Sequence, residues 1–81
     1  MNWELKFNVK ARKQLHRIPK RDAEYILSAL EIVAMDPFSR DVKRMKGELN
    51  TWRCRVGAYR IFYNLYFDQK IIDVYSIERR T

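Results

Sequence analysis

Strict alternation of apolar and polar side chains predicts strands at both ends of the chain. Residues 3–9 alternate in this way, and so do residues 52–56 and 59–67 on either side of Gly57-Ala58. A period of two residues is that of a strand with one buried face. A last strand is expected over residues 70–78. The apolar side of the first strand comprises Trp3, Leu5, Phe7 and Val9.

Helical spacing of apolar residues predicts two helices after the first strand. Residues 10–18 form a short helix by this pattern, and Pro19 suits the first turn of a second one. The second helix is expected to end before Pro37, because a residue that precedes proline avoids the helical region. Its apolar face comprises Ala23, Ile26, Leu27, Leu30, Val33 and Ala34.

The central segment predicts a hairpin whose two faces differ in chemistry. Gly57-Ala58 is expected to be its two-residue loop, with Gly57 supplying the positive φ that such turns need. This loop places Arg55 opposite Arg60. One face is apolar and is expected in the core, namely Trp52, Cys54, Val56, Tyr59, Ile61 and Tyr63. The other face, which we term the arginine face, carries Arg53, Arg55 and Arg60.

The last strand is expected to contain a bulge. Its apolar positions are Ile72, Val74 and Ile77. These three face inward together only if an extra residue intervenes, so we expect a bulge near Tyr75-Ser76. The bulge brings Glu78 and Arg80 to the arginine face, whereas an unbroken strand would bring Arg79 there instead.

A basic connector over residues 38–49 completes the element order. It is expected to hold a short strand near residues 42–45 and a turn at Lys46-Gly47. The order β-α-α-β-β-β-β then predicts a single α+β domain over residues 1–81. In this fold two N-terminal helices pack on one face of a mostly antiparallel, twisted sheet, and the other face stays open.

The charge balance favours a polyanionic partner. Lys and Arg number 17 against 10 Asp and Glu, a net charge of +7, which makes binding to a polyanion strongly salt-dependent. The single cysteine excludes an internal disulfide and supplies no metal framework. The first residues lack a signal-peptide pattern, and no apolar run approaches the ~20 residues that cross a bilayer. A cytoplasmic protein without a membrane partner is therefore expected.

The arginine face is unfavourable unless an anion binds there. Like charges directly opposite on a sheet destabilise it, whereas a favourable cross-strand pair contributes ~0.2–1 kcal/mol. Guanidinium groups hold phosphate oxygens in a planar, bidentate geometry, so phosphate is the leading candidate ligand. The alternative is a solvated basic face that protects the sheet from aggregation.

The residues around the hairpin resemble a known family. Residues 46–49 read Lys-Gly-x-Leu, residues 52–63 read Trp-Arg-x-Arg-Val-Gly-x-Tyr-Arg-Ile-x-Tyr, and the last strand ends Arg79-Arg80. With the length and element order, this pattern resembles the RelE/ParE superfamily of bacterial and archaeal toxins. RelE-type members are ribosome-dependent ribonucleases that cut messenger RNA in the ribosomal A site, and a cognate antitoxin wraps around each toxin. ParE-type members share the fold but inhibit DNA gyrase.

This resemblance implies an active site on the arginine face. The family's basic positions correspond to Arg53, Arg55 and Arg60, and the arginine at the end of its last strand corresponds to Arg80. The implied reaction is attack of a ribose 2′-hydroxyl on the neighbouring phosphodiester, without a metal or other cofactor, which leaves a 2′,3′-cyclic phosphate. Arg60, assisted by Arg80, would stabilise the phosphate charge. Arg53 and Arg55 would grip the flanking phosphates and help to activate the 2′-hydroxyl.

The rim of this site and its proton donor are assigned from alternation and from proximity in the sequence. The residues expected to contact RNA are Lys43, Arg44 and Lys46 at the rim, together with Phe62 and Arg79. Many RelE-type toxins continue past the terminal arginine to a tyrosine or histidine that protonates the leaving oxygen, whereas this sequence stops at Thr81. Tyr75 and Glu78 are the candidates for that role.

The expected function is therefore that of a type II toxin with messenger RNA on the ribosome as its target. Its expected partner is a cognate antitoxin, with the toxin monomeric alone and in a higher-order complex when bound. One alternative is a ParE-type gyrase inhibitor, which needs no phosphate-cleaving arginines and usually has a longer helical hairpin. The other is a non-catalytic member of the fold that binds antitoxin or RNA.

Overall fold

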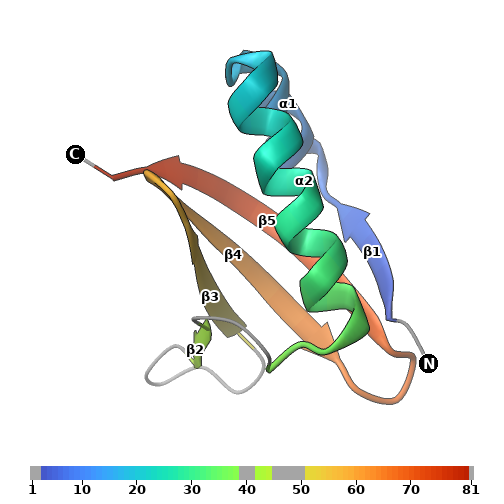
Figure 1. The fold of residues 1–81 in the computed structure, drawn as a ribbon. Coiled ribbons are helices and arrows are strands. Elements are labelled where there is room, and N and C mark those ends of the chain that lie inside the picture. The colour runs from blue at the N-terminus through green and yellow to red at the C-terminus, as the bar shows by residue number, and fades with distance from the viewer. Residues whose placement is uncertain (1–2, 39–41, 45–50, 81) are drawn as a thin grey trace.

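Figure 1 shows the computed structural model, which describes residues 3–38, 42–44 and 51–80. Within these residues two helices and five strands follow one another in the predicted order. The elements are β1 (Glu4–Phe7), α1 (Val9–Arg17), α2 (Lys20–Met35), β2 (Val42–Arg44), β3 (Thr51–Val56), β4 (Tyr59–Tyr66) and β5 (Ile71–Arg79). The turn expected at Lys46-Gly47 lies outside the described residues.

The strands form one sheet in the order β1-β5-β4-β3-β2. Strand β1 runs parallel to β5, and each of the other neighbouring pairs is antiparallel. The two helices connect one edge strand to the other, and they pack on a single face of the twisted sheet (Figure 1). This arrangement confirms the predicted α+β fold.

The core lies between α2 and the inner face of the sheet. The helices contribute Ala11, Ile26, Ala29, Leu30, Val33 and Ala34. The sheet contributes Cys54, Val56, Tyr59, Ile61, Tyr63, Leu65, Ile72, Val74 and Ile77. Removing these apolar surfaces from water is the main favourable term in folding. The predicted inner face of the hairpin is therefore confirmed, with Trp52 packed partly against the cluster.

Two positions of the expected apolar faces are exposed, and those predictions are wrong. Val9 begins α1 instead of ending β1, because the Asn8 side chain accepts a hydrogen bond from the Ala11 N–H at 2.8 Å and caps the helix. Val9 is accordingly 62% exposed. Leu27 is 36% exposed, since it lies at the edge of the buried stripe of α2, and Ala29 is buried in that stripe instead.

The helix bounds follow the two prolines. Pro19 precedes α2 as its N-cap residue rather than standing in the first turn, and its carbonyl accepts the Ala23 N–H at 2.9 Å. Helix α2 ends at Met35, directly before Asp36-Pro37, as the proline rule predicts.

The hairpin has the predicted register. Val56 pairs with Tyr59 and Arg55 with Arg60 across a two-residue loop. Gly57, with φ of 56°, supplies the left-handed backbone conformation at the first loop position. A side chain at this position would meet only the Tyr25 ring at an ordinary contact distance of 3.6 Å, so backbone conformation rather than space favours glycine.

The predicted bulge is present between β4 and β5. Phe62 pairs with Ser76 and Tyr63 pairs with Val74, which leaves Tyr75 as the extra residue on β5. The extra residue lets Val74 and Ile77 both face the core, where they are 0% and 4% exposed. Beyond the bulge, residues of β5 have therefore changed faces relative to an unbroken strand.

Two tyrosines of β4 are buried in different ways. The Tyr59 hydroxyl donates a hydrogen bond to the Asp22 carboxylate of α2 at 2.8 Å, and this bond, with burial, raises the pKa of Tyr59. The Tyr63 hydroxyl is buried without a hydrogen-bond partner among the described residues. Burial, with a smaller contribution from Cys54, raises the pKa of Tyr63 far above its ordinary value.

These two hydroxyls should respond oppositely to removal. Tyr59→Phe removes the bond between β4 and α2 and leaves Asp22 without it, so the free energy of unfolding at neutral pH should fall. Tyr63→Phe removes only an unsatisfied buried hydroxyl, so stability should stay equal or rise. Urea unfolding of both variants measures the difference, and a larger loss in Tyr63→Phe would contradict it.

Stability should also fall at alkaline pH. Because both pKa values are raised in the folded state, the unfolded chain loses these protons first, near the ordinary tyrosine pKa of about 10. The contribution of these two protonated hydroxyls to the free energy of unfolding is therefore complete below about pH 10, and it is lost as the pH rises beyond that value. Tyr63→Phe should make this decline shallower in unfolding experiments at increasing pH, and an unchanged slope would contradict the assignment.

Gly57→Ala should destabilise the hairpin by about 1–2 kcal/mol, because a left-handed backbone is unfavourable for a residue with a Cβ atom. Ala58→Gly is the matched control in the same loop and should cost less, since Ala58 does not have a positive φ. Thermal or urea unfolding measures both, and equal costs would contradict the conformational explanation.

Candidate functional site

The strand register assembles a row of charged residues across three strands on the open face of the sheet. Arg55 of β3 lies directly opposite Arg60 of β4. On its other side, Arg60 pairs with Glu78 of β5. Arg53 lies one row along, opposite Phe62. The arginine face is thus the sheet surface opposite the helices, as the sequence predicts, and Glu78 reaches it because of the bulge.

Two cations of this face, Arg53 and Arg60, are not neutralised by another described residue. Arg53 and Arg60 are half-buried, and Arg55 is exposed. The side chains of Arg53 and Arg60 form no hydrogen bond or ion pair with another described residue. The ion pair present among described side chains joins Lys6 and Glu4 at 3.8 Å, in the distant edge strand β1. The positive charge of Arg53 and Arg60 is therefore open to an anion.

An aromatic pair adjoins the arginines. The rings of Phe62 and Tyr75 lie with centroids 6.2 Å apart and an interplanar angle of 40°, and both side chains are half-buried. The bulge presents Tyr75 beside Phe62. One row further along, the Thr51 hydroxyl and the Asn64 side-chain oxygen are hydrogen-bonded at 2.8 Å. Aromatic rings beside cations suit unstacked RNA bases.

Arg80 follows the end of β5, beside the hairpin loop. Its backbone N–H donates to the Ala58 carbonyl at 2.6 Å, and Figure 1 shows this end of the chain next to the β3–β4 turn. The alternation of the strand assigns Arg80 to the same side as Glu78, although its exposed side chain lies past the last paired residue. Its catalytic role stays a prediction.

Arg79 lies on the face of the sheet opposite to the arginine face. It pairs with Tyr59 in the register, and its guanidinium lies 5.7 Å from the centre of the Tyr59 ring, an arrangement that favours a cation. The bulge is the reason, because it turns Glu78 rather than Arg79 towards the arginines. The contact of Arg79 with RNA stays a prediction, for a residue that lies on the inner face and not beside these arginines.

The other rim residues are placed only in part. Strand β2 pairs with β3 so that Lys43 occupies the register position opposite Arg53, and Arg44 the position opposite Trp52. Lys43 is thus at a position of the arginine face and Arg44 at one of the inner face. Lys46 lies outside the described residues. The RNA contacts of all three stay predictions.

The two candidate proton donors are both near the arginines. Glu78 is exposed, and its Oε2 accepts a hydrogen bond from the Ser76 hydroxyl at 3.2 Å. Ser76, only 2% exposed, is a supporting residue that sequence reasoning missed. The inferred bulge was the available signal for it, because the bulge turns both Ser76 and Glu78 to the arginine face.

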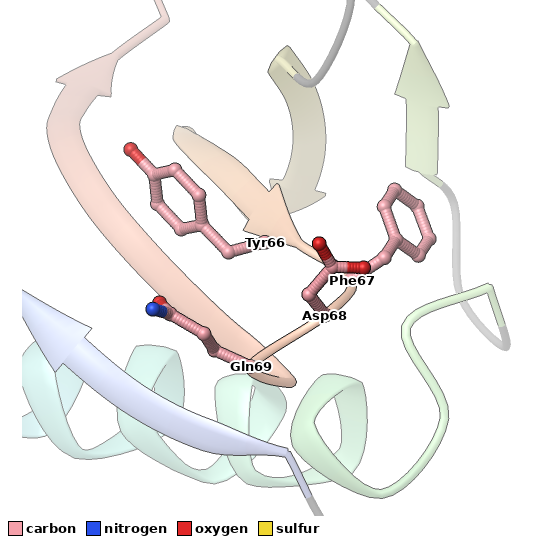
Figure 2. A pocket seen from close by; sticks show the side chains of 4 residues that line it. All are labelled: Tyr66, Phe67, Asp68 and Gln69. Atoms are coloured by element: carbon pink, nitrogen blue, oxygen red, sulfur yellow. The ribbon is translucent and has the colours of Figure 1, made fainter.

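A hollow elsewhere on the molecule is not part of this site. Figure 2 shows it at the β4–β5 turn, where it has a volume of about 500 Å³ and is lined by Tyr66, Phe67, Asp68 and Gln69. It lies at the opposite end of β4 from Arg60.

Among the described residues no group of three or more His, Cys, Asp or Glu side chains could hold a metal ion. No described helix is long and apolar enough to span a membrane.

A second basic cluster lies on the helices. Six exposed cations come from α1 and the start of α2, namely Lys10, Arg12, Lys13, Arg17, Lys20 and Arg21. His16, also on α1, is exposed and remote from the arginine face. The single cysteine, Cys54, is buried in the core, in agreement with its predicted structural role.

Known proteins match this chain over nearly its whole length. Residues 5–81 match the family model described as the ParE toxin of type II toxin–antitoxin systems. A protein of Methanocaldococcus jannaschii named RelE1, described as a candidate toxin, is 30% identical over 94% of this chain and 92% of its own length.

Solved structures of toxin–antitoxin complexes have the same fold. The archaeal RelE–RelB complex of Pyrococcus horikoshii contains a chain that superposes with a TM-score of 0.84 at 25% identity, covering 99% of this chain and 97% of that one. The complex RelBE2 of Mycobacterium tuberculosis gives a TM-score of 0.88 at 22% identity, covering 99% and 100%. Together with the family match, these similarities show that the chain belongs to the ParE toxin family of type II toxin–antitoxin systems, within the RelE/ParE superfamily.

Proposed function

We propose that this toxin is a ribosome-dependent endoribonuclease that cuts messenger RNA. The observation that supports this most strongly is the arginine face, where Arg55 and Arg60 are paired directly across two strands and Arg53 lies in the next row. Two of these side chains are half-buried without a partner for their charge among the described residues. A folded protein retains such repulsion where it serves to bind an anion, and a phosphodiester fits the fork of a guanidinium.

Cleavage by a 2′-hydroxyl needs this kind of surface. As O2′ attacks phosphorus, negative charge builds up on the two non-bridging oxygens, and fixed cations directed at them lower the barrier. Arg60 has this role, with Arg80 assisting, and Arg53 and Arg55 hold the flanking phosphates. The products are a 2′,3′-cyclic phosphate and a 5′-hydroxyl. The reaction uses side chains of the toxin and needs no metal ion.

The proposed partners are the ribosome with its messenger RNA and a cognate antitoxin. The antitoxin is supported by the similarity to toxins solved as RelE–RelB and RelBE2 complexes. The net charge of +7 favours both ribosomal RNA and an acidic antitoxin segment. Since its target is the translating ribosome, the toxin acts in the cytoplasm.

A gyrase inhibitor is the second candidate, because the matching family model is described as the ParE toxin. Two features favour the nuclease. Helices α1 and α2 have 9 and 16 residues, a shorter hairpin than ParE-type toxins usually carry. A gyrase inhibitor also has no need of three arginines on one open sheet face.

Arg60→Ala should abolish growth inhibition and lower ribosome-dependent cleavage by about 10²–10³-fold, because the charge stabilisation at the reacting phosphate is lost. The fold should persist, since the Arg60 side chain bonds to no other described residue. Primer extension on translated message measures cleavage, and circular dichroism measures the fold. Lys6→Ala is the matched control, a cation of edge strand β1 paired with Glu4, and should cleave normally.

The outcomes separate the candidate functions. Unchanged cleavage in Arg60→Ala would contradict the assignment of the arginines. DNA damage with intact message in cells that express the unmodified toxin would support gyrase inhibition instead. A toxin that produces neither effect but binds its antitoxin would be a non-catalytic member of the fold.

A further inference from the structure

Glu78 is a carboxylate in the same row of the sheet as two arginines of the candidate site. It pairs directly with Arg60, which itself pairs with Arg55, so the three side chains form one row across β5, β4 and β3. Directly opposite residues on a sheet have Cβ atoms about 5 Å apart. Among the described strands, Glu78 is the acidic residue of this row, and no described cation lies within 4 Å of its carboxylate.

The arginines cannot carry out one step of the proposed reaction, the removal of the proton from the 2′-hydroxyl. Attack of O2′ on phosphorus requires that the 2′-hydroxyl lose its proton. Guanidinium stays protonated at all ordinary pH values and offers donors only, so Arg53, Arg55 and Arg60 cannot accept it. A glutamate side chain is ordinarily ionised at neutral pH and is an acceptor.

We propose that the Glu78 carboxylate accepts the 2′-hydroxyl proton during cleavage, an inference that rests on the proposed nuclease function. The O2′–H bond breaks and the proton moves to Glu78 as the O2′–P bond forms. The P–O5′ bond then breaks, and the 5′-oxygen takes a proton from water. Glu78 returns its proton to solvent, so the enzyme is unchanged at the end of the cycle.

Ser76 is the positioning residue for this carboxylate. Its buried hydroxyl donates to Glu78 Oε2 at 3.2 Å, which restrains one oxygen of the carboxylate that accepts the proton. The same bulge that inserts Tyr75 brings Ser76 and Glu78 to the arginine face. The residue that accepts the proton and the residue that holds it therefore share one structural cause.

Other proton acceptors on this face fit less well. Asp73 is also on the open side of β5, but it pairs with Asn64, four residues from Arg60 along β4 and hence about 13 Å away. Tyr75 is in the bulge, where its ring packs near Phe62, and a phenol is ordinarily protonated at neutral pH. Glu4 belongs to the edge strand β1 and is paired with Lys6.

Chemical rescue tests the assignment on the intact toxin with programmed ribosomes. Glu78→Ala should lower the single-turnover cleavage rate by about 10²–10⁴-fold, the usual worth of a general base. Acetate should restore part of this rate, whereas nitrate at equal ionic strength should not, because nitrate carries the charge without the basicity. Glu78→Asp should retain partial activity, and Ser76→Ala should lose less than Glu78→Ala. Glu4→Ala, a carboxylate on the same sheet, is the control and should cleave normally.

The results distinguish this inference from the nuclease function itself. If the unmodified toxin leaves message intact on ribosomes, both are wrong. If it cleaves and Arg60→Ala does not, while Glu78→Ala cleaves at the full rate, only the assignment of Glu78 is wrong. Equal rescue of Glu78→Ala by acetate and nitrate would also overturn it, since the carboxylate would then act only through its charge.

Discussion

The candidate site depends on two strand pairings whose register cannot shift independently. The two-residue loop at Gly57 places Arg55 opposite Arg60, and the bulge at Tyr75 places Glu78 on the other side of Arg60. A shift of one residue in either pairing would turn the apolar set to solvent and the charges into the core. The buried side chains of β3, β4 and β5 therefore hold the charged row in place, and the energetic cost of crowding guanidiniums is offset by the core on the reverse face.

The candidate site lies on the open face of the sheet. The arginine face is a sheet surface, and its shape suits an extended strand of RNA better than a small molecule enclosed in a pocket. The hollow at the β4–β5 turn is remote from the charged row and has only one carboxylate among its lining residues (Figure 2). A message held by the ribosome would be an extended strand of this kind, as the proposed function requires.

The hairpin, its register and even the bulge could be predicted from the sequence, because an alternating pattern allows one assignment of faces. The two misplaced core residues fail for local reasons. Val9 is part of an alternating run, but the Asn8 cap starts a helix there, and Leu27 lies at the border of a stripe in which Ala29 is buried. Arg79 and Ser76 show the limit at the site. Periodicity gives the face of a residue, but neither the stacking of Arg79 on Tyr59 nor the bond from Ser76 to Glu78 can be read from spacing.

In the proposed mechanism, Arg60 acts on the non-bridging oxygens of the phosphate that is cut. Replacing one of these oxygens by sulfur in message bound to the ribosome weakens its hydrogen bonds to a guanidinium, so the unmodified toxin should slow with one phosphorothioate diastereomer. Arg60→Ala should lose that sensitivity, because the two changes remove the same interaction and their effects are not additive. If the phosphorothioate message slowed cleavage equally for the unmodified toxin and for Arg60→Ala, Arg60 would not contact the reacting phosphate. That result would contradict the account.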